Sequence, residues 1–436
     1  MEKIKNAVAR AAESQGAEAY EITVSTKESA GAEAWKDEIA SVSYALAGTM
    51  TVRCVVDGKS GYASSELVTP EAAAELAERA CANACIMEEA DLVGIFNGSE
   101  SYQAAKEPVK PLPETSKLKE DALDLQRKLY GQSEKIVEAT QSSVSGLRLS
   151  KAFVNSAGLD LEYSCSIETR SAAAAVQDGE ETANEFRTVP VEKESAQETA
   201  EKSVQAALAM LGARTVDSGK YDLILDKGTM RSLLGTFATV FSARNAYLKT
   251  TLYAGKEGET VAAPIVSIVD DPFYPGKWNH CPFDGEGVAV SSKYVIENGV
   301  LNTLLYNRMY AKLLGQETTG NAADARHISP KGLYIVPGQM SEEALLEKLG
   351  DGIYITALNG LHAGANAQTG DFSLQAEGFL VEGGKKTRPV KSFTIADNFY
   401  QLLKKVEALG DTVEFGAGGD IGAPEVLVKG ISVAGK

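Results

Sequence analysis

Acidic side chains near the middle of the chain are the first candidates for chemistry. Asp270 and Asp271 are adjacent and precede Pro272, whereas Asp284 and Glu286 lie two residues apart. Carboxylates can act as general acids or bases. Adjacent residues of an extended chain face opposite ways, and residues two apart face the same way. We therefore interpret Asp270-Asp271 as a turn before proline, with paired-carboxylate chemistry as the alternative, and predict that Asp284 and Glu286 line a cleft.

Metal-ligating and nucleophilic residue types are sparse in this sequence. The only histidines are His280, His327 and His362, and no two of them lie within one helical turn. His362 stands in a glycine-rich apolar loop, where a lone histidine is more often a structural hydrogen-bonder than a catalyst. Cys81 and Cys85 are one helical turn apart and could share a metal, but an alanine-rich helix favours a buried apolar role for both. The sequence contains neither Gly-x-Ser-x-Gly nor a P-loop.

Composition limits the possible classes of protein. The chain has 436 residues, of which 44% are hydrophobic and 24% are charged, as in ordinary globular proteins. Its formal charge of −17 argues against nucleic-acid binding, because phosphate recognition needs clustered Lys and Arg. The start lacks the apolar core of a secretory signal, and no run of apolar residues is long enough to cross a membrane. Five cysteines, an odd number, suit a reducing compartment, so we expect a cytoplasmic protein that binds no membrane.

The first half of the chain mixes helical and strand patterns. Residues 97–113 are polar and contain three prolines, which indicates a connector and a possible sub-boundary. We predict an α+β domain over 1–214, with helices on one face of an antiparallel sheet. The expected helices are 2–15, 69–87, 116–130 and 195–211; the expected strands are 19–26, 34–46, 48–57, 61–64, 147–154 and 159–167, and an acidic loop is expected at 178–184.

The second half, 219–436, is predicted to be a β-rich domain. Its patterns predict three helices, at 229–246, 342–349 and 395–408. Short strands are expected at 221–225, 265–269, 294–301, 333–337, 352–358, 370–378, 379–382 and 425–433. The fold class predicted for the whole chain is therefore α+β.

An ordered series of short motifs in the second half resembles the TldD/PmbA family. The family's members carry the label of modulators of DNA gyrase and are regarded as peptidases. The resemblance is dense in the second half and loose in the first. The matching stretches are Gly258-Glu259, Asp270-Asp271-Pro272, Asp284-Gly-Glu-Gly287, Thr318-Thr-Gly-Asn321, Thr369-Gly-Asp-Phe-Ser373, Gly378-Phe379, Pro389-Val390 and Thr394-Ile-Ala-Asp-Asn398.

The resemblance distinguishes two branches of this family. The TldD branch carries His-Glu-x-x-x-His on the helix before the Gly-Glu turn, and a later cysteine completes its zinc site. Here the corresponding helix, 233–240, holds neither histidine nor acid, and the last cysteine is Cys281. The sequence thus resembles the PmbA branch, also called TldE. This resemblance implies a chain with no metal ligands, no cofactor and no catalytic residues of its own.

The function implied is that of a partner subunit. It would pair with a zinc-bearing TldD-type paralogue to degrade small or unstructured peptides, and it would form a homodimer when alone. Arg244 and Asn245 end the helix that holds zinc in the other branch, so they would lie near a peptide channel together with Asp284, Glu286 and His362. Two alternatives stay open: a regulatory binding protein, including the gyrase-linked role, and an autonomous hydrolase with a different constellation.

Overall fold

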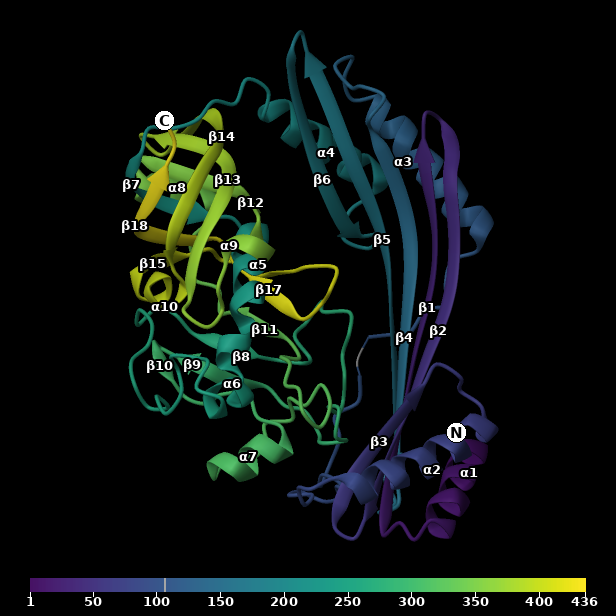
Figure 1. Cartoon of the computed structure of the whole chain (residues 1–436). Helices are drawn as coiled ribbons and strands as arrows, with labels where there is room; N and C mark the ends of the chain where they lie inside the picture. Colours follow the sequence, from purple (N-terminus) through teal and green to yellow (C-terminus); the bar gives the residue numbers. More distant parts are fainter. Residues whose placement is uncertain (106) are drawn as a thin grey trace.

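The two halves of the chain lie side by side (Figure 1). The structure is a computed structural model that describes residues 1–105 and 107–436. The first half is a tall sheet, and the second half is a shorter body built on two further sheets. Lys106, within the predicted connector, lies outside the described residues; the rest of 97–113 contains neither helix nor strand.

The tall sheet is antiparallel throughout and has the strand order β3-β2-β1-β4-β5-β6. Strands β1, β2, β4 and β5 have 15 to 19 residues, far more than strands typically have in globular proteins. Strand β1 pairs with β2 and β4 along almost its whole length. The strands are β1 (Ala19–Trp35), β2 (Glu38–Val56), β3 (Lys59–Ser65), β4 (Gln141–Asn155), β5 (Asp160–Asp178) and β6 (Glu181–Pro190).

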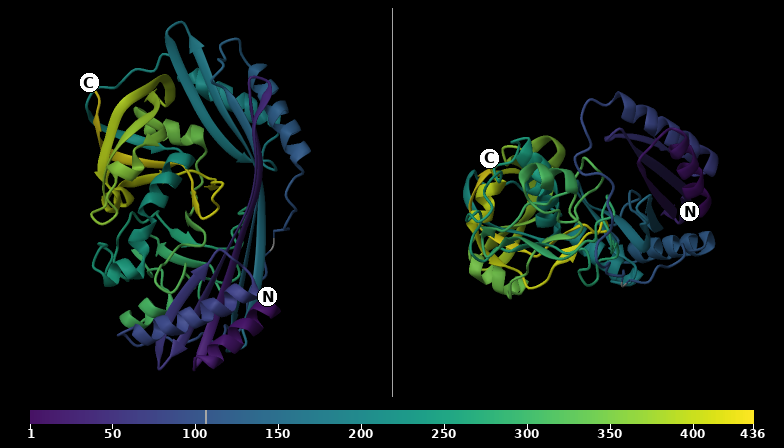
Figure 2. Two further views of the ribbon diagram at one scale, coloured as in Figure 1. Left: turned by 45° about the vertical axis from the view of Figure 1, so that its right-hand side comes forward. Right: turned by 90° about the horizontal axis from the view of Figure 1, so that it is seen from below.

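Helices cover one face of this sheet. Alternate residues of each strand point to opposite faces, so one set of side chains packs under the helices and the other set faces away from them. Even-numbered residues towards both ends of β1 are buried with the helices: Ile22 and Val24 at one end, and Ala30, Ala32 and Ala34 at the other. The odd-numbered residues on the other face include Glu21, Thr23 and Ser25. In the right-hand view of Figure 2, helices α1 and α2 lie on the side of the sheet away from the second half. The helices are α1 (Glu2–Ser14), α2 (Pro70–Ile86), α3 (Thr115–Tyr130) and α4 (Ala196–Ala209).

Two sequence predictions for the first half are wrong. Residues 34–46 and 48–57 do not form separate strands, since 38–56 are one continuous strand. The hairpin instead turns at Lys36 and Asp37, which both adopt positive φ, the backbone of a tight two-residue turn. The acidic stretch 178–184 is not a loop, because only Gly179 and Glu180 separate β5 from β6.

The second half contains two six-stranded sheets. One has the order β10-β9-β8-β11-β17-β16; the other has the order β14-β13-β12-β7-β18-β15 and closes on itself where β14 pairs with β18. The strands are β7 (Gly219–Leu225), β8 (Ile268–Asp270), β9 (Lys293–Glu297), β10 (Val300–Leu301), β11 (Leu333–Ile335), β12 (Gly352–Asn359), β13 (Asp371–Glu382), β14 (Lys385–Asn398), β15 (Val406–Leu409), β16 (Glu414–Phe415), β17 (Ile421–Ala423) and β18 (Val426–Ala434).

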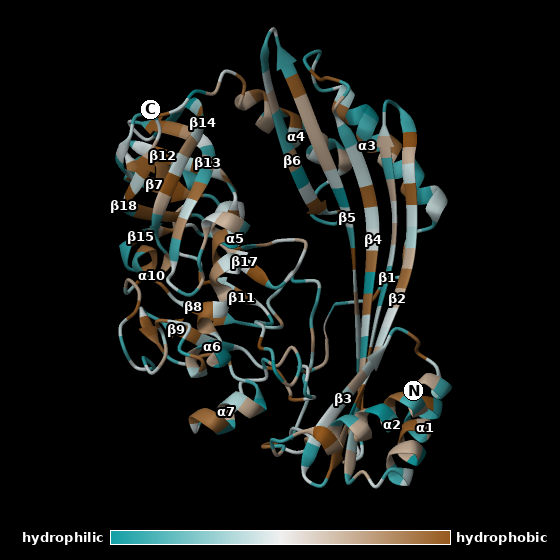
Figure 3. Cartoon of the chain, viewed as in Figure 1, coloured by the Kyte–Doolittle hydropathy of each residue, from teal (hydrophilic) through white to brown (hydrophobic). Residues whose placement is uncertain are grey.

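The main core lies between these two sheets and around α5. Strands β7, β12 and β18 are largely apolar (Figure 3), and they contribute Leu223, Ile353 and Val428 to the core, all fully buried. The helices are α5 (Lys227–Phe237), α6 (Ala243–Tyr247), α7 (Arg308–Leu314), α8 (Glu342–Leu349), α9 (Leu361–Gly364) and α10 (Phe399–Leu402), with short 3₁₀ turns η1 (Ala238–Phe241) and η2 (Leu403–Lys405).

For two helices predicted in the second half, the predicted ends are wrong. The predicted helix 229–246 breaks between η1 and α6, because the backbone there bonds to another segment: the Ala243 N–H donates to the Leu305 carbonyl at 2.9 Å, and the Leu305 N–H donates to the Phe241 carbonyl at 2.8 Å. The predicted helix 395–408 begins as strand, since Ile395 pairs with β13 and β18 at once.

The predicted fold class is confirmed. Helices and antiparallel strands form the first half, and strands dominate the second, so the chain is mixed α+β. Among the described residues, none of the helices is both long enough and apolar enough to cross a membrane.

Candidate functional site

Helix α5 corresponds to the helix that carries the zinc motif in the TldD branch. Leu233 and Leu234 are fully buried in the main core. Gly235 faces β17, and a Cβ built on it would lie 3.6 Å from the Ile421 side chain. Thr239, beyond the end of the helix, is exposed. The two positions that would supply imidazoles are therefore occupied by Leu234, which lies in the core, and by Thr239. The position that would supply the carboxylate is Gly235, which has no side chain.

The loop after β16, where the resemblance places the cysteine ligand of the TldD branch, packs against α5. Arg231 of α5 forms a 2.9 Å ion pair with Glu414, and Gly416 packs so closely on Arg231 that a Cβ there would lie 2.9 Å from its Nε. Residues 415–419 read Phe-Gly-Ala-Gly-Gly and offer no thiol. Zinc needs three or four N, S or carboxylate ligands, so these residues do not fit that ion. Within 1–105 and 107–436, no group of three or more His, Cys, Asp or Glu side chains could hold a metal.

Arg244 and Asn245 lie on α6, just after the break in the helix. The Asn245 amide donates to the Thr239 carbonyl at 2.9 Å, and its own carbonyl accepts from the Thr250 N–H at 2.8 Å. Asn245 therefore closes the end of the preceding turn. Arg244 is half-buried on the same short helix, which packs against α7 through Tyr247 and Tyr310, with ring centroids 5.7 Å apart.

Asp284 and Glu286 are both buried, but they do different things. The Asp284 carboxylate accepts from the N–H groups of Glu286 at 2.9 Å, Val288 at 3.0 Å and Ala322 at 2.8 Å, which fixes a turn. Glu286 accepts from the Arg308 N–H at 2.9 Å through Oε2. Burial, and then the charge of Asp284, raise the pKa of Glu286 to about 8.

Asp270 and Asp271 have different hydrogen-bond partners, because adjacent residues of an extended chain face opposite ways. Asp270 is fully buried and accepts from Lys293, Asn321 and the N–H groups of Lys331 and Gly332. Burial by itself would raise the pKa of Asp270, but Lys293 and these donors hold it below the ordinary value. Asp271 instead accepts from the Phe273 N–H at 2.9 Å, the bond of an Asp-initiated turn.

The five predicted site residues do not converge on one place. His362 is exposed on α9, which lies beside α5 and β13. Glu286 is bound at the start of α7, at the lower end of the second half in Figure 1, well away from α9. Of the five, Arg244 and Asn245 are neighbours on α6, and Asp284 and Glu286 share one turn, in which the Glu286 N–H donates to the Asp284 carboxylate.

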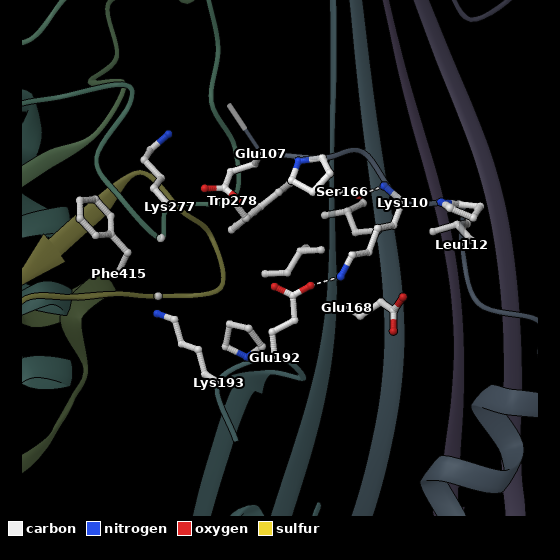
Figure 4. A pocket seen from close by; sticks show the side chains of 17 residues that line it. Glu107, Lys110, Leu112, Ser166, Glu168, Glu192, Lys193, Lys277, Trp278 and Phe415 are labelled. Atoms are coloured by element: carbon white, nitrogen blue, oxygen red, sulfur yellow. Dashed lines mark hydrogen bonds and ion pairs between the residues drawn. The ribbon is translucent and has the colours of Figure 1, made fainter. Parts of the chain in front are cut away.

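A cleft of about 310 Å³ opens between the two halves, next to the loop that packs on α5. Apolar walls are formed by Ile167 of β5, Pro108 and Pro111 of the connector, and Trp278 and Phe415 of the second half. Figure 4 shows Trp278 and Phe415 across the cleft from Lys110 and Ser166. The Trp278 indole N–H donates to the Ala417 carbonyl at 2.9 Å, so this wall is fastened to the 415–419 loop.

The lysines at this cleft have different surroundings. Lys110 is bonded to Glu192 and, through its backbone N–H, to the Ser166 hydroxyl at 2.7 Å. Lys277 is buried, donates to the Asn279 carbonyl at 2.8 Å, and has its pKa lowered by burial. The cleft joins segments more than a hundred residues apart, and nothing in the sequence around Trp278 or Ser166 marked either residue as lining it.

This α+β architecture, with a cleft between a long antiparallel sheet and a β-rich body, has clear relatives. Residues 218–435, half of the chain, match the family description "PmbA/TldA metallopeptidase C-terminal domain". Residues 20–84 match "PmbA/TldA metallopeptidase domain 1". The chain belongs to the PmbA/TldD metallopeptidase family.

Individual relatives agree with this assignment. A Haemophilus influenzae protein named metalloprotease PmbA homolog is 26% identical over 86% of this chain and 84% of its own. A Thermotoga maritima crystal structure, described as a proposed modulator of a DNA gyrase, has a TM-score of 0.89 at 29% identity, over 99% of this chain and 100% of its own. TldE from Thermococcus kodakarensis has the same TM-score and the same coverage at 22% identity, a level that shows the fold alone.

Proposed function

We propose that this chain is the TldE-like partner subunit of a cytoplasmic metallopeptidase pair. It holds no zinc, cleaves nothing alone, and completes a chamber for small or unstructured peptides when a zinc-bearing TldD-type paralogue joins it. One observation supports this proposal above all. Helix α5 packs against the 415–419 loop, yet Leu234, Gly235 and Thr239 occupy the positions where zinc ligands would be needed.

The cleft beside that loop supports a peptide as the ligand. Its walls are apolar, and polar groups such as the Lys110–Glu192 pair line its edges, which is how binding sites for extended chains are built. Without a metal, a bound water keeps a pKa near the bulk value and is a poor nucleophile at neutral pH. Among the described residues, no serine or cysteine at the cleft is hydrogen-bonded to a histidine that could activate it.

Peptide hydrolysis tests this proposal directly. The isolated chain is incubated with an unstructured peptide, then mixed with a purified zinc-bearing paralogue, with and without a chelator. We expect no cleavage above background by the isolated chain, cleavage in the mixture, and loss of cleavage with chelator. Chelator-resistant cleavage by the isolated chain would favour an autonomous hydrolase instead.

Metal content provides an independent check. After exhaustive dialysis, mass spectrometry of the isolated chain should detect well below one zinc per chain, because neither α5 nor the 415–419 loop supplies soft or imidazole ligands. About one bound zinc per chain would contradict the assignment to the TldE branch.

The regulatory alternative has less support. The Thermotoga maritima relative carries a gyrase-related description, but a chain of net charge −17 is a poor surface for DNA. A gel-shift assay at low salt should show no binding of duplex DNA by this chain.

A further inference from the structure

A second, smaller cavity of about 240 Å³ lies where the polar face of the tall sheet meets the second half. The register brings its sheet residues onto one face, since Glu21 is opposite Arg53 and Ser25 is opposite Lys151. The segments around Gly285-Glu286 and 323–325 close the cavity from the other side. This cavity shares no lining residue with the cleft described above.

Two buried carboxylates on opposite walls of this cavity each leave one oxygen without a donor. Glu21 is 7% exposed and Glu286 is 3% exposed. Glu21 Oε2 accepts from Arg53 at 2.7 Å, and Glu286 Oε2 accepts from the Arg308 N–H at 2.9 Å. Among the described residues, neither Glu21 Oε1 nor Glu286 Oε1 has a hydrogen-bond partner. Buried oxygens of this kind are costly unless something donates to them.

The neighbouring arginine cannot serve both oxygens. Arg53 already donates to Glu21, to Asp91 at 2.5 Å and to Ser60 at 3.0 Å. A hard divalent cation is a poor candidate, because it needs six or more oxygen ligands and would lie beside the Arg53 charge. A primary ammonium group has a single positive charge and three N–H donors, which suits two carboxylate oxygens facing one space.

A cation on the same sheet face offers a complementary group. Lys151 lines the cavity, and within the described part of the chain its ammonium has no hydrogen bond or ion pair. Burial, and then the charge of Lys331, lower the pKa of Lys151 to about 8. The cavity therefore has an acidic side and a basic side. Its volume equals that of about eight waters, which suits a ligand no larger than an amino acid or a dipeptide.

We propose that this cavity binds a free amino acid or dipeptide, with its α-ammonium between Glu21 and Glu286 and its carboxylate towards Lys151. The proposal uses neither α5 nor the cleft at Trp278, so it stands or falls independently of the peptidase assignment.

Proton release distinguishes this binding mode from adventitious binding. Glu286 faces Asp284, Arg308 and Asp324 on its own side and Glu21, Arg53, Tyr62 and Lys151 across the cavity. With a pKa of about 8 it is protonated at pH 6.5, whereas a carboxylate that pairs with an ammonium must be ionised. Lys151 is already protonated at that pH. Binding at pH 6.5 should therefore release about one proton per site.

Isothermal titration calorimetry of the full-length chain tests the proposal. L-Ala-L-Ala is titrated at pH 6.5 in two buffers of different ionisation enthalpy, which yields the number of protons released. We expect binding with release of about one proton. N-acetyl-L-Ala-L-Ala, which lacks the ammonium, should bind at least about tenfold more weakly. The diamine 1,5-diaminopentane tests the other source of a primary ammonium and should bind more weakly than L-Ala-L-Ala.

Variants identify the residues. Glu286→Gln keeps the shape but should weaken L-Ala-L-Ala binding at least about tenfold and abolish proton release. Glu257→Gln is the matched control, because Glu257 pairs with Tyr306 outside the cavity, and it should bind as the wild type does. Lys151→Met should weaken L-Ala-L-Ala but not 1,5-diaminopentane. Thermal unfolding verifies that each variant is folded.

Three outcomes would overturn the proposal. These are no binding of any probe at millimolar concentration, equal binding of the acetylated dipeptide, and tighter binding of the diamine than of L-Ala-L-Ala. Failure of peptide cleavage in the mixed assay would leave this result untouched, because the titration contains no paralogue.

Discussion

At the residue scale, the ionisable side chains that the fold buries should govern how stability changes with pH. Glu286 has a folded-state pKa of about 8, above its ordinary value of 4.5. Below pH 4.5 the residue is protonated in both the folded and the unfolded state, so its burial does not lower the free energy of unfolding through ionisation. Between pH 4.5 and about 8 only the unfolded state is ionised, so folding takes up a proton and stability falls as pH rises.

The first prediction follows from this loss of stability as pH rises. Replacing Glu286 by Gln removes the titration, so the variant's free energy of unfolding should exceed the wild type's by an amount that grows between pH 5 and 8, reaching on the order of 4 kcal/mol. Urea unfolding at several pH values measures it. Asp226→Asn is the control: the Asp226 pKa is raised to about 6, first by burial, so its difference should level off near pH 6. A Glu286→Gln profile parallel to the wild type would contradict the prediction.

A second prediction concerns the buried ion pairs of Arg53. This side chain is 4% exposed and pairs with Glu21 and Asp91. Arg53→Met leaves two buried carboxylates without their cation and should lower the free energy of unfolding by about 3–5 kcal/mol. Lys117→Met, which breaks an exposed helix pair with Asp121, should cost no more than about 0.5 kcal/mol. Equal losses from both variants, measured by urea denaturation, would refute the argument.

Single residues also show what the sequence could reveal about sites. The two-residue spacing of Asp284 and Glu286 pointed to a functional segment, and both residues are buried there, but Asp284 proved to fix a turn. Nothing in the sequence around Lys151 or Glu21 indicated that either residue lines a binding site. The cavity that they line joins residues of the four strands β1, β2, β3 and β4 with Gly285-Glu286 and residues 323–325. A single sequence does not show that segments so far apart along the chain meet in the fold.

At the scale of elements, local pattern predicted most helices and failed where another segment supplied the hydrogen bonds. The Ser195–Glu198 capping box was readable in the sequence, and both of its bonds form. The break after η1 was not, because Leu305 imposes it through backbone bonds. The turn at Lys36-Asp37 was missed since neither residue is the glycine or asparagine that usually signals positive φ.

The third prediction tests whether α5 could be converted into a zinc helix. The triple variant Leu234→His, Gly235→Glu, Thr239→His restores the spacing of the motif, yet it should bind no stoichiometric zinc, because the 415–419 loop still offers no thiol. It should also lose about 2–5 kcal/mol of stability, since Leu234 is fully buried and an imidazole there would be unsatisfied.

Thr239→His alone is the matched control for that variant. Position 239 is exposed, so this substitution should change the free energy of unfolding by no more than about 0.5 kcal/mol. Metal analysis together with thermal unfolding decides the matter: a stable triple variant that retains one zinc per chain would show that the fold tolerates the site.

At the scale of the whole molecule, the tall sheet leaves a long edge open. Strand β3 pairs only with Met50–Val56 of β2, so the outer stretch of β2 has no neighbour on that side among the described strands. Val42, Tyr44 and Leu46 lie there in one row and are 44%, 64% and 66% exposed. An unpaired edge with exposed apolar side chains readily pairs with a second chain.

We therefore expect the isolated chain to form a homodimer, which light scattering at micromolar concentration would detect. Replacing Val42 and Leu46 by Lys should shift the mass towards the monomer, because two charges per edge oppose pairing with an identical edge. Ile86→Lys, at a position 79% exposed at the end of α2, is the control and should leave the mass unchanged. A monomer at every concentration would leave only pairing with the zinc-bearing paralogue. A dimer that the double variant does not weaken would place the interface elsewhere on the molecule.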